Sequence, residues 1–308
     1  MARETGACPW CSAALEIDTR QRSQTCPVCG KTFRQTAEHG QPGVKALSDF
    51  QMYDGKLEKY TGSLADVQVP EGVRIISDFV FRGHAGIRSI KLPDTLTSIY
   101  AEAFRGCSGL TEITLPPGVR TIGASAFRNC AGLIRVELSE GLEEIRESAF
   151  ADCKALREIV LPSTVRKIER QAFQGCTSLE RVVIPSGITR IRGFSFKDCA
   201  SLTRVELPEG LERIAPQAFG GCAKLPDIEI PESVQLIRSR AFKDCVGLAS
   251  VRVNFPTVAE EDAFQGCACL NRDSFDAPEA WKRRNRSCAA CLRPLPIGER
   301  IHRFLSGK

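Results

Sequence analysis

Apolar residues recur along this chain with a period of 23 residues, and the period predicts an array of repeats. Phenylalanine marks the register at positions 81, 104, 127, 150, 173, 196, 219 and 242, and a last one follows at 264. Downstream of each of the first eight phenylalanines comes a triplet with apolar outer positions, such as Ile113-Thr114-Leu115. Because side chains alternate between the two faces of a strand, each triplet predicts a short strand whose outer residues are buried.

A coil of 23 residues cannot bury its own apolar face, so neighbouring coils must stack. The junctions between repeats read LxxIxL, as from Leu110 to Leu115, which resembles the strand signature of leucine-rich repeats. The expected fold is therefore a leucine-rich repeat β-solenoid, with parallel strands on one face and short turns or 3-10 segments on the other. A proline, which cannot donate to a strand ladder, ends most of the strands, and Ser139 replaces it in one repeat. The outward strand positions carry mixed charges, and we expect this surface to bind a partner: Lys91, Arg135, Glu137, Arg181, Arg204, Glu206, Glu229 and Arg252.

The repeats resemble the BspA-like class of leucine-rich repeats, whose unit reads roughly "IP..V..I...AF..C..L..". The resemblance covers residues 67–272 and implies binding to proteins or surfaces without enzymatic activity. Many relatives in that class are exported surface proteins.

The ends of the array require polar covers, because the first and last coils have no outer neighbour. Residues 48–66 predict a capping hairpin with Asp54-Gly55 as a type I′ turn. At the other end, Phe275 and Trp281 near a short predicted helix are expected to cover the last coil. The predicted parts are a zinc ribbon at 1–34, a linker at 35–47, a solenoid at 48–272 with nine repeats from 67 onward, and a helix with a CxxC tail at 273–308.

A cysteine column runs through the repeats, three residues after each phenylalanine, with His84 in that place in the first repeat. The simplest interpretation is a small buried thiol that donates weakly to backbone carbonyls in a tight turn. Disulfides are geometrically conceivable, but pairing neighbours would break the uniform stack. Metal binding or redox sensing is not favoured, because apolar burial raises the thiol pKa. The column comprises Cys107, Cys130, Cys153, Cys176, Cys199, Cys222, Cys245 and Cys267.

Two CxxC motifs near the N-terminus predict a structural zinc site. Cys8 and Cys11 form the first motif, and Cys26 and Cys29 form the second. Four thiolates on two knuckles supply the closed tetrahedral shell of Zn²⁺, and the metal supplies folding energy that so short a segment lacks. The rival interpretation is redox chemistry, because CPWC resembles the CPYC of glutaredoxins. That motif requires a βαβ context, and only seven residues precede Cys8.

The C-terminal tail carries weaker signals. Cys288 and Cys291 form a lone CxxC that is a second candidate zinc site, with only His302 as a further nitrogen ligand, and a metal-free dithiol is an equal alternative. A basic cluster at 282–286 is interpreted either as a phosphate contact or as the solvated face of a capping helix.

Charge and composition limit the kinds of partner that the chain is expected to bind. Residues 67–272 carry 26 basic and 25 acidic side chains, so the body has no electrostatic preference for nucleic acid or membrane. A secretory signal pattern and an apolar run of membrane length are both missing, so we expect a cytoplasmic location without membrane insertion. The expected function is non-enzymatic recognition of an unidentified protein partner. The alternative is a nucleic-acid-associated protein that uses the ribbon and the basic tail.

Overall fold

The computed structural model describes residues 3–7, 14–18, 23–28, 32–34, 49–253, 257–270 and 274–278. The chain divides into two compact units, Met1–Leu156 and Arg157–Lys308.

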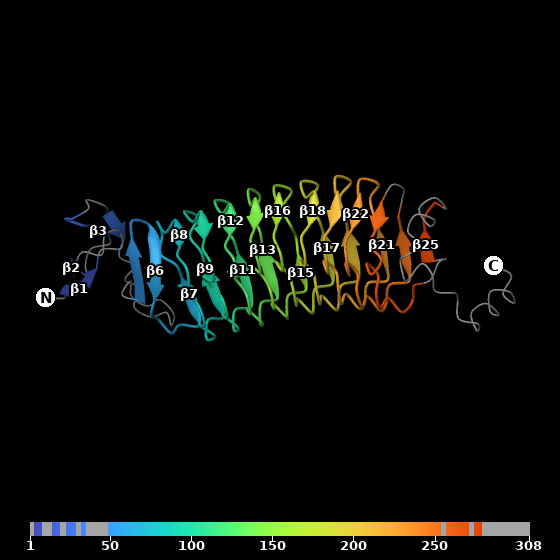
Figure 1. The fold of residues 1–308 in the computed structure, drawn as a ribbon. Coiled ribbons are helices and arrows are strands. Elements are labelled where there is room, and N and C mark those ends of the chain that lie inside the picture. Colours follow the sequence, from blue (N-terminus) through green and yellow to red (C-terminus); the bar gives the residue numbers. More distant parts are fainter. Residues whose placement is uncertain are drawn as a thin grey trace. The chain divides into compact units, whose positions relative to one another are not determined.

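Each repeat contributes two short strands (Figure 1). In each unit the triplet strands form a parallel arrangement, here called the first ladder. A second strand of two residues follows the proline turn in each repeat, and these strands form the second ladder. The expectation of turns or 3-10 segments opposite the triplet strands was therefore incomplete. In one such repeat Val119 and Ile122 are both buried, and Thr121-Ile122 pairs with the neighbouring coils on both sides. A strand of two residues is too short to show an alternating pattern in the sequence, so this ladder was not expected.

The N-terminal unit holds two small hairpins, a capping hairpin and the first coils. The small hairpins are β1 (Arg3–Ala7) with β2 (Ala14–Asp18) and β3 (Ser23–Thr25) with β4 (Thr32–Arg34), and the capping hairpin is β5 (Phe50–Tyr53) with β6 (Lys56–Tyr60). Its first ladder contains β7 (Asp66–Gln68), β9 (Ser89–Lys91), β11 (Glu112–Thr114) and β13 (Arg135–Glu137). Its second ladder contains β8 (Ile75–Ile76), β10 (Ser98–Ile99), β12 (Thr121–Ile122) and β14 (Glu144–Ile145).

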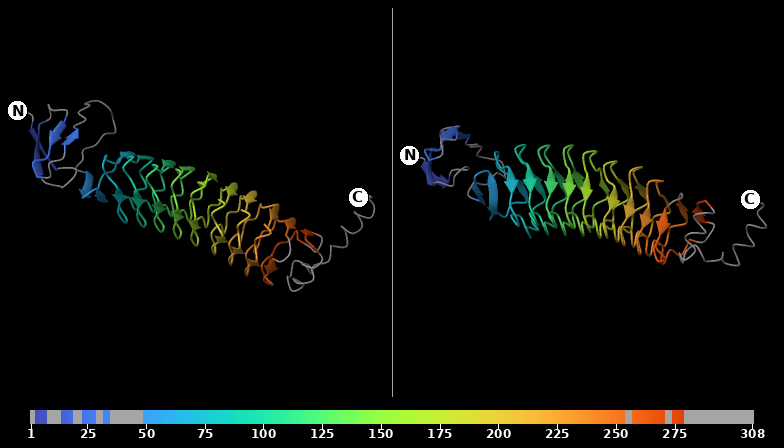
Figure 2. Two further views of the ribbon diagram at one scale, coloured as in Figure 1. Left: turned by 90° about the horizontal axis from the view of Figure 1, so that it is seen from above. Right: turned by 45° about the horizontal axis from the view of Figure 1, so that its top comes forward.

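The C-terminal unit continues the same pattern of two strands in each repeat, as Figure 2 shows from two further directions. Its first ladder contains β15 (Glu158–Ile159), β17 (Arg181–Val183), β19 (Arg204–Glu206), β21 (Asp227–Glu229), β23 (Ser250–Arg252) and β25 (Phe275–Asp276). Its second ladder contains β16 (Lys167–Ile168), β18 (Arg190–Ile191), β20 (Arg213–Ile214), β22 (Leu236–Ile237) and β24 (Val258–Ala259).

The capping hairpin has the turn that the sequence predicts. Asp54 and Gly55 both adopt positive φ, 45° and 72°, as the two central positions of a type I′ turn require. β6 then pairs in parallel with β8, with Leu57 opposite Ile76. The hairpin therefore covers the start of the second ladder.

The interior is a column of stacked phenylalanine rings. Within the N-terminal unit, Phe81 and Phe104 lie with centroids 5.1 Å apart and planes 5° from parallel. Tyr60 covers the first ring at 5.1 Å. In the C-terminal unit, Phe275 meets Phe264 edge-on, with centroids 5.3 Å apart. A ring from outside the repeats thus contacts the phenylalanine column in each unit.

The last coil closes differently from the expectation. Phe275, which is 1% exposed, covers the end as predicted, but it does so from strand β25, which pairs in parallel with β23. The short helix expected near Phe275 and Trp281 stays a prediction, because residues 279–308 lie outside the described residues. Trp281 lies outside the described residues. The ladder offset also falls from 23 residues (Ser98 opposite Thr121) to 22 (Leu236 opposite Val258), as a shortened final repeat requires.

Candidate functional site

The outward side chains of the first ladder form an open surface in both units. Exposed and buried residues alternate along its strands, as in β11 and β17. Seven of the eight predicted surface residues are exposed, and Glu206 is half-buried. The outward assignment made from the alternation therefore agrees with the structure, whereas a binding role for these residues remains a proposal.

Charges on this surface are matched across neighbouring coils in the C-terminal unit. The carboxylate of Glu206 accepts from Arg181 at 2.8 Å and lies 3.0 Å from the Arg204 guanidinium. The hydrogen bond from Arg181 is the main reason why the pKa of Glu206 is lowered. The surface is thus held as a set of ion pairs rather than as isolated charges.

A second cluster lies further along the same unit. The Arg252 guanidinium contacts Glu229 at 3.1 Å and Asp276 at 3.2 Å, and the hydrogen bond to Glu229 is the main cause of its raised pKa. Sequence reasoning missed Asp276, because it ended the repeats at residue 272 and expected no strand beyond them.

The N-terminal unit has a smaller cluster. Arg135 and Glu137 of β13 pair at 2.9 Å, and the Thr114 hydroxyl donates to Glu137 at 2.9 Å. Lys91 of β9 is exposed. Arg135, Glu137 and Thr114 form a local polar network on the outside of the first ladder.

Two valines interrupt the charged surface of the C-terminal unit. Val160 is 69% exposed and Val183 is 41% exposed. Glu158 lies opposite Arg181 in the β15–β17 pair, so the two valines, each two residues further on, stand on neighbouring coils. Both valines continue the outward side of the first ladder, and their side chains therefore face solvent.

The column cysteines are buried thiols in the structure. All eight column cysteines are buried and free of disulfides. Sγ atoms of the column donate to the carbonyl of the phenylalanine in the preceding repeat, as Cys107 does to Phe81 at 3.0 Å and Cys199 does to Phe173 at 3.2 Å. Burial raises the pKa of Cys107 to about 12. The column therefore serves the turn, as the simplest interpretation of the sequence had it.

The two small hairpins bracket the N-terminal CxxC motifs. Ala7 pairs with Ala14 in β1–β2, and residues 8–13 between them include Cys8 and Cys11. Thr25 pairs with Thr32 in β3–β4, and residues 26–31 between them include Cys26 and Cys29. Cys26 is fully buried. Each CxxC motif thus falls, along the sequence, between the two strands of one pair.

Several predicted features lie outside the described residues. They include Cys8, Cys11 and Cys29 of the first zinc set and Cys288 and Cys291 of the second. In the part of the chain that is described, no group of three or more His, Cys, Asp or Glu side chains is arranged to hold a metal ion. The same residues contain no helix with the length and apolar character needed to cross a bilayer.

Comparison with known proteins agrees with the coil geometry. The model of the family described as "BspA type Leucine rich repeat region" matches residues 57–176 and 143–271. A leucine-rich repeat protein of T. pallidum is 28% identical, with a TM-score of 0.56, over 59% of this chain and 90% of that one. A leucine-rich cell surface protein of Faecalibacterium prausnitzii is 19% identical, with a TM-score of 0.40, over 79% of this chain and 94% of that one. A comparison with curated proteins gave no match.

Proposed function

The chain belongs to the BspA-type leucine-rich repeat family, and from this premise we propose that it is a non-enzymatic scaffold that binds a protein partner. Leucine-rich repeat proteins are generally protein-interaction scaffolds. The proposed contact surface is the first ladder of the C-terminal unit, centred on Val160 and Val183.

The exposed valine pair is the observation that carries this proposal. Interfaces place apolar residues at the centre of a polar rim, where water is excluded on binding. Val160 and Val183 have that setting, because Arg181, Arg204 and Glu206 lie on the same and the next strands. Ion pairs that are already formed lose little side-chain freedom on binding, so they can select a partner by charge.

An affinity comparison tests the proposal. The immobilised wild-type chain and a Val160→Glu/Val183→Glu variant are compared for the proteins that each retains from an extract of the source cells. A partner of the proposed surface is retained by the wild type and lost from the variant, while circular dichroism shows the variant to be folded. Equal retention by both chains contradicts the assignment of this surface.

We also propose that Cys8, Cys11, Cys26 and Cys29 hold one structural Zn²⁺. The hairpins around the two motifs and the burial of Cys26 support it. A bound zinc supplies the cross-link that these short strands lack, because its four thiolate ligands come from both hairpins.

A further inference from the structure

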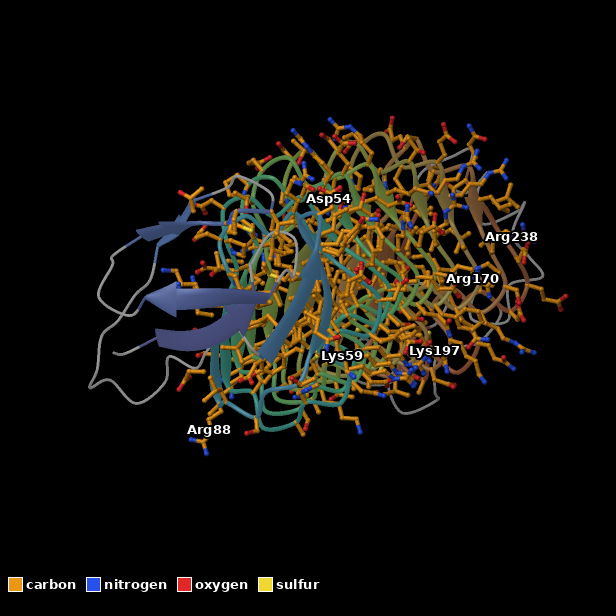
Figure 3. All side chains as sticks on the ribbon, turned by 90° about the vertical axis from the view of Figure 1, so that its left-hand side faces the viewer. Asp54, Lys59, Arg88, Arg170, Lys197 and Arg238 are labelled. Atoms are coloured by element: carbon orange, nitrogen blue, oxygen red, sulfur yellow. The ribbon has the colours of Figure 1, made fainter. Side chains whose placement is uncertain are left out.

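Arginines gather on the second-ladder side of the C-terminal unit. The arginine patch consists of Arg166, Arg170, Arg190, Arg192 and Arg213, around strands β16, β18 and β20. Arg190 and Arg213 stand directly opposite each other in the β18–β20 pair. Four of the five are exposed and Arg192 is half-buried. The side chain of Arg170, labelled in Figure 3, lies over the Phe194 ring at 5.7 Å from its centroid.

Few carboxylates neutralise this patch. Arg190 lies 3.8 Å from Glu212, and neighbouring Lys167 pairs with Glu169 at 3.1 Å. Within the described residues, Arg170, Arg192 and Arg213 make no ion pair with an acidic side chain. Like charges directly opposite each other on a sheet destabilise it. The folded protein therefore keeps a repulsion between Arg190 and Arg213 that a bound anion would reduce.

The first ladder of the same unit shows the contrast. Arg181 and Arg204 also stand opposite each other, but there Glu206 lies within 3.0 Å of both. On the second-ladder side, Arg238 pairs with Glu260 at 2.7 Å, beyond the patch. Unmatched arginines are thus a local feature of three consecutive coils and not a general property of this surface.

The arginines and their apolar border favour a ligand that carries carboxylates. The guanidinium fork binds carboxylates through two parallel hydrogen bonds. Leu236, half-buried, lies opposite Arg213 in the β20–β22 pair and gives the patch an apolar border. A local excess of about four charges neutralises few phosphates, which leaves little of the salt-dependent affinity on which nucleic-acid binding depends.

We propose that the arginine patch is a second docking surface, for an acidic polypeptide segment of a partner protein that also carries apolar residues. This surface is separate from the first-ladder surface of the proposed function, and either can fail without the other.

Fluorescence anisotropy with a short labelled peptide, rich in Glu with interspersed Leu, tests the proposal. The full chain is expected to bind the peptide, and Arg190→Ala/Arg213→Ala is expected to weaken binding at least about tenfold. The matched control is Arg238→Ala/Arg240→Ala, which removes two arginines of the same unit that already pair with Glu260 and Asp262. It is expected to change the affinity by less than about twofold.

A stability measurement separates binding from a structural role. Arg213→Glu places a carboxylate opposite Arg190, so its thermal midpoint is expected to equal or exceed that of the wild type while peptide binding is lost. A lowered midpoint, or equal binding by the Arg190→Ala/Arg213→Ala variant, overturns the proposal. Tighter, patch-dependent binding of a single-stranded oligonucleotide than of the peptide overturns it in favour of nucleic acid.

Discussion

At the scale of single residues, one phenylalanine in each repeat, and one cysteine in every repeat after the first, form the interior. The rings of Phe173 and Phe196 stack at 5.4 Å, and the Cys199 thiol reaches back to the carbonyl of Phe173 in the preceding repeat. All three residues are buried, so the same positions that define the period also define the core.

Truncation of a stacked ring is expected to be costly. Phe173, fully buried, should lose about 3–5 kcal/mol of unfolding free energy on substitution by Ala, because the cavity left behind cannot collapse between stacked coils. Exposed Thr114→Ala should cost about 0.5 kcal/mol or less. Denaturant midpoints of the two variants provide the check, and equal losses would show the inward and outward assignment to be wrong.

The raised pKa of the column thiols predicts a loss of stability at high pH. Cys107 has a folded pKa of about 12 against an ordinary value of 9.0, so above pH 9 the unfolded chain releases a proton that the folded chain keeps. Stability is therefore complete below pH 9 and falls as pH rises. The unfolding free energy, measured by urea titration at a series of pH values above 9, should fall less steeply with pH in Cys107→Ala than in the wild type. The expected difference in slope is about 1.4 kcal/mol per pH unit for this one group. Identical slopes would contradict the burial argument.

At the scale of elements, each coil turns through residues of positive φ. One such position follows the phenylalanine by two residues and holds only Gly, Asn or Asp, as in Gly83, Asn129 and Asp198. These residue types adopt the left-handed conformation at low cost. The sequence therefore carries a residue suited to the turn between the ladders two positions after each phenylalanine of the column.

Two glycines of the first repeat provide a matched test of this turn. A Cβ added at either Gly83 or Gly86 would meet nothing within 4 Å, but only Gly83 has a positive φ, of 76°. Gly83→Ala should therefore lower stability by about 1–2 kcal/mol. Gly86→Ala should leave it unchanged or raise it by up to about 1 kcal/mol. Equal thermal shifts in the two variants would rule out φ as the cause.

The sequence predicted the first ladder, the core columns and the capping hairpin, and it missed the second ladder and the last strand. The period located the phenylalanine and cysteine columns, the triplet strands and the hairpin turn at Asp54. The second ladder was missed because strands of two residues, such as Ile75–Ile76, are too short to alternate. Strand β25 was missed because Phe275 lies outside the 23-residue register, and with it the ion pair from Asp276 to Arg252. The arginine patch was missed because the 23-residue spacing does not show which arginines have an acidic partner on a neighbouring coil.

At the scale of the whole molecule, the zinc proposal gives the repeats and the N-terminal hairpins different sources of stability. The coils have buried ring columns, whereas the strands before residue 35 are short and carry the two CxxC motifs. Repeat arrays are stabilised by contacts between neighbouring coils, and small metal sites by the ion itself.

Metal removal should therefore separate the two parts. Purified protein is expected to contain about one equivalent of zinc. The zinc should be lost from Cys26→Ser/Cys29→Ser and kept by Cys288→Ser/Cys291→Ser. A chelator should leave the circular dichroism of the coils nearly unchanged, because they have their own core. Zinc retained without Cys26 and Cys29 would move the site to the C-terminal pair, and protein free of zinc would restore the redox interpretation of Cys8 and Cys11.

Protein binding by the first-ladder surface around Val160 and Val183 is the proposal on which the function depends. Site-specific photo-cross-linking in the source cells tests it most directly, with a photoreactive residue in place of Val183 and, as control, in place of exposed Lys224. We expect a discrete cross-linked protein from position 183, lost when Val160→Glu is added, and none from position 224. An equal product from both positions, or no product from position 183, would contradict the proposed function.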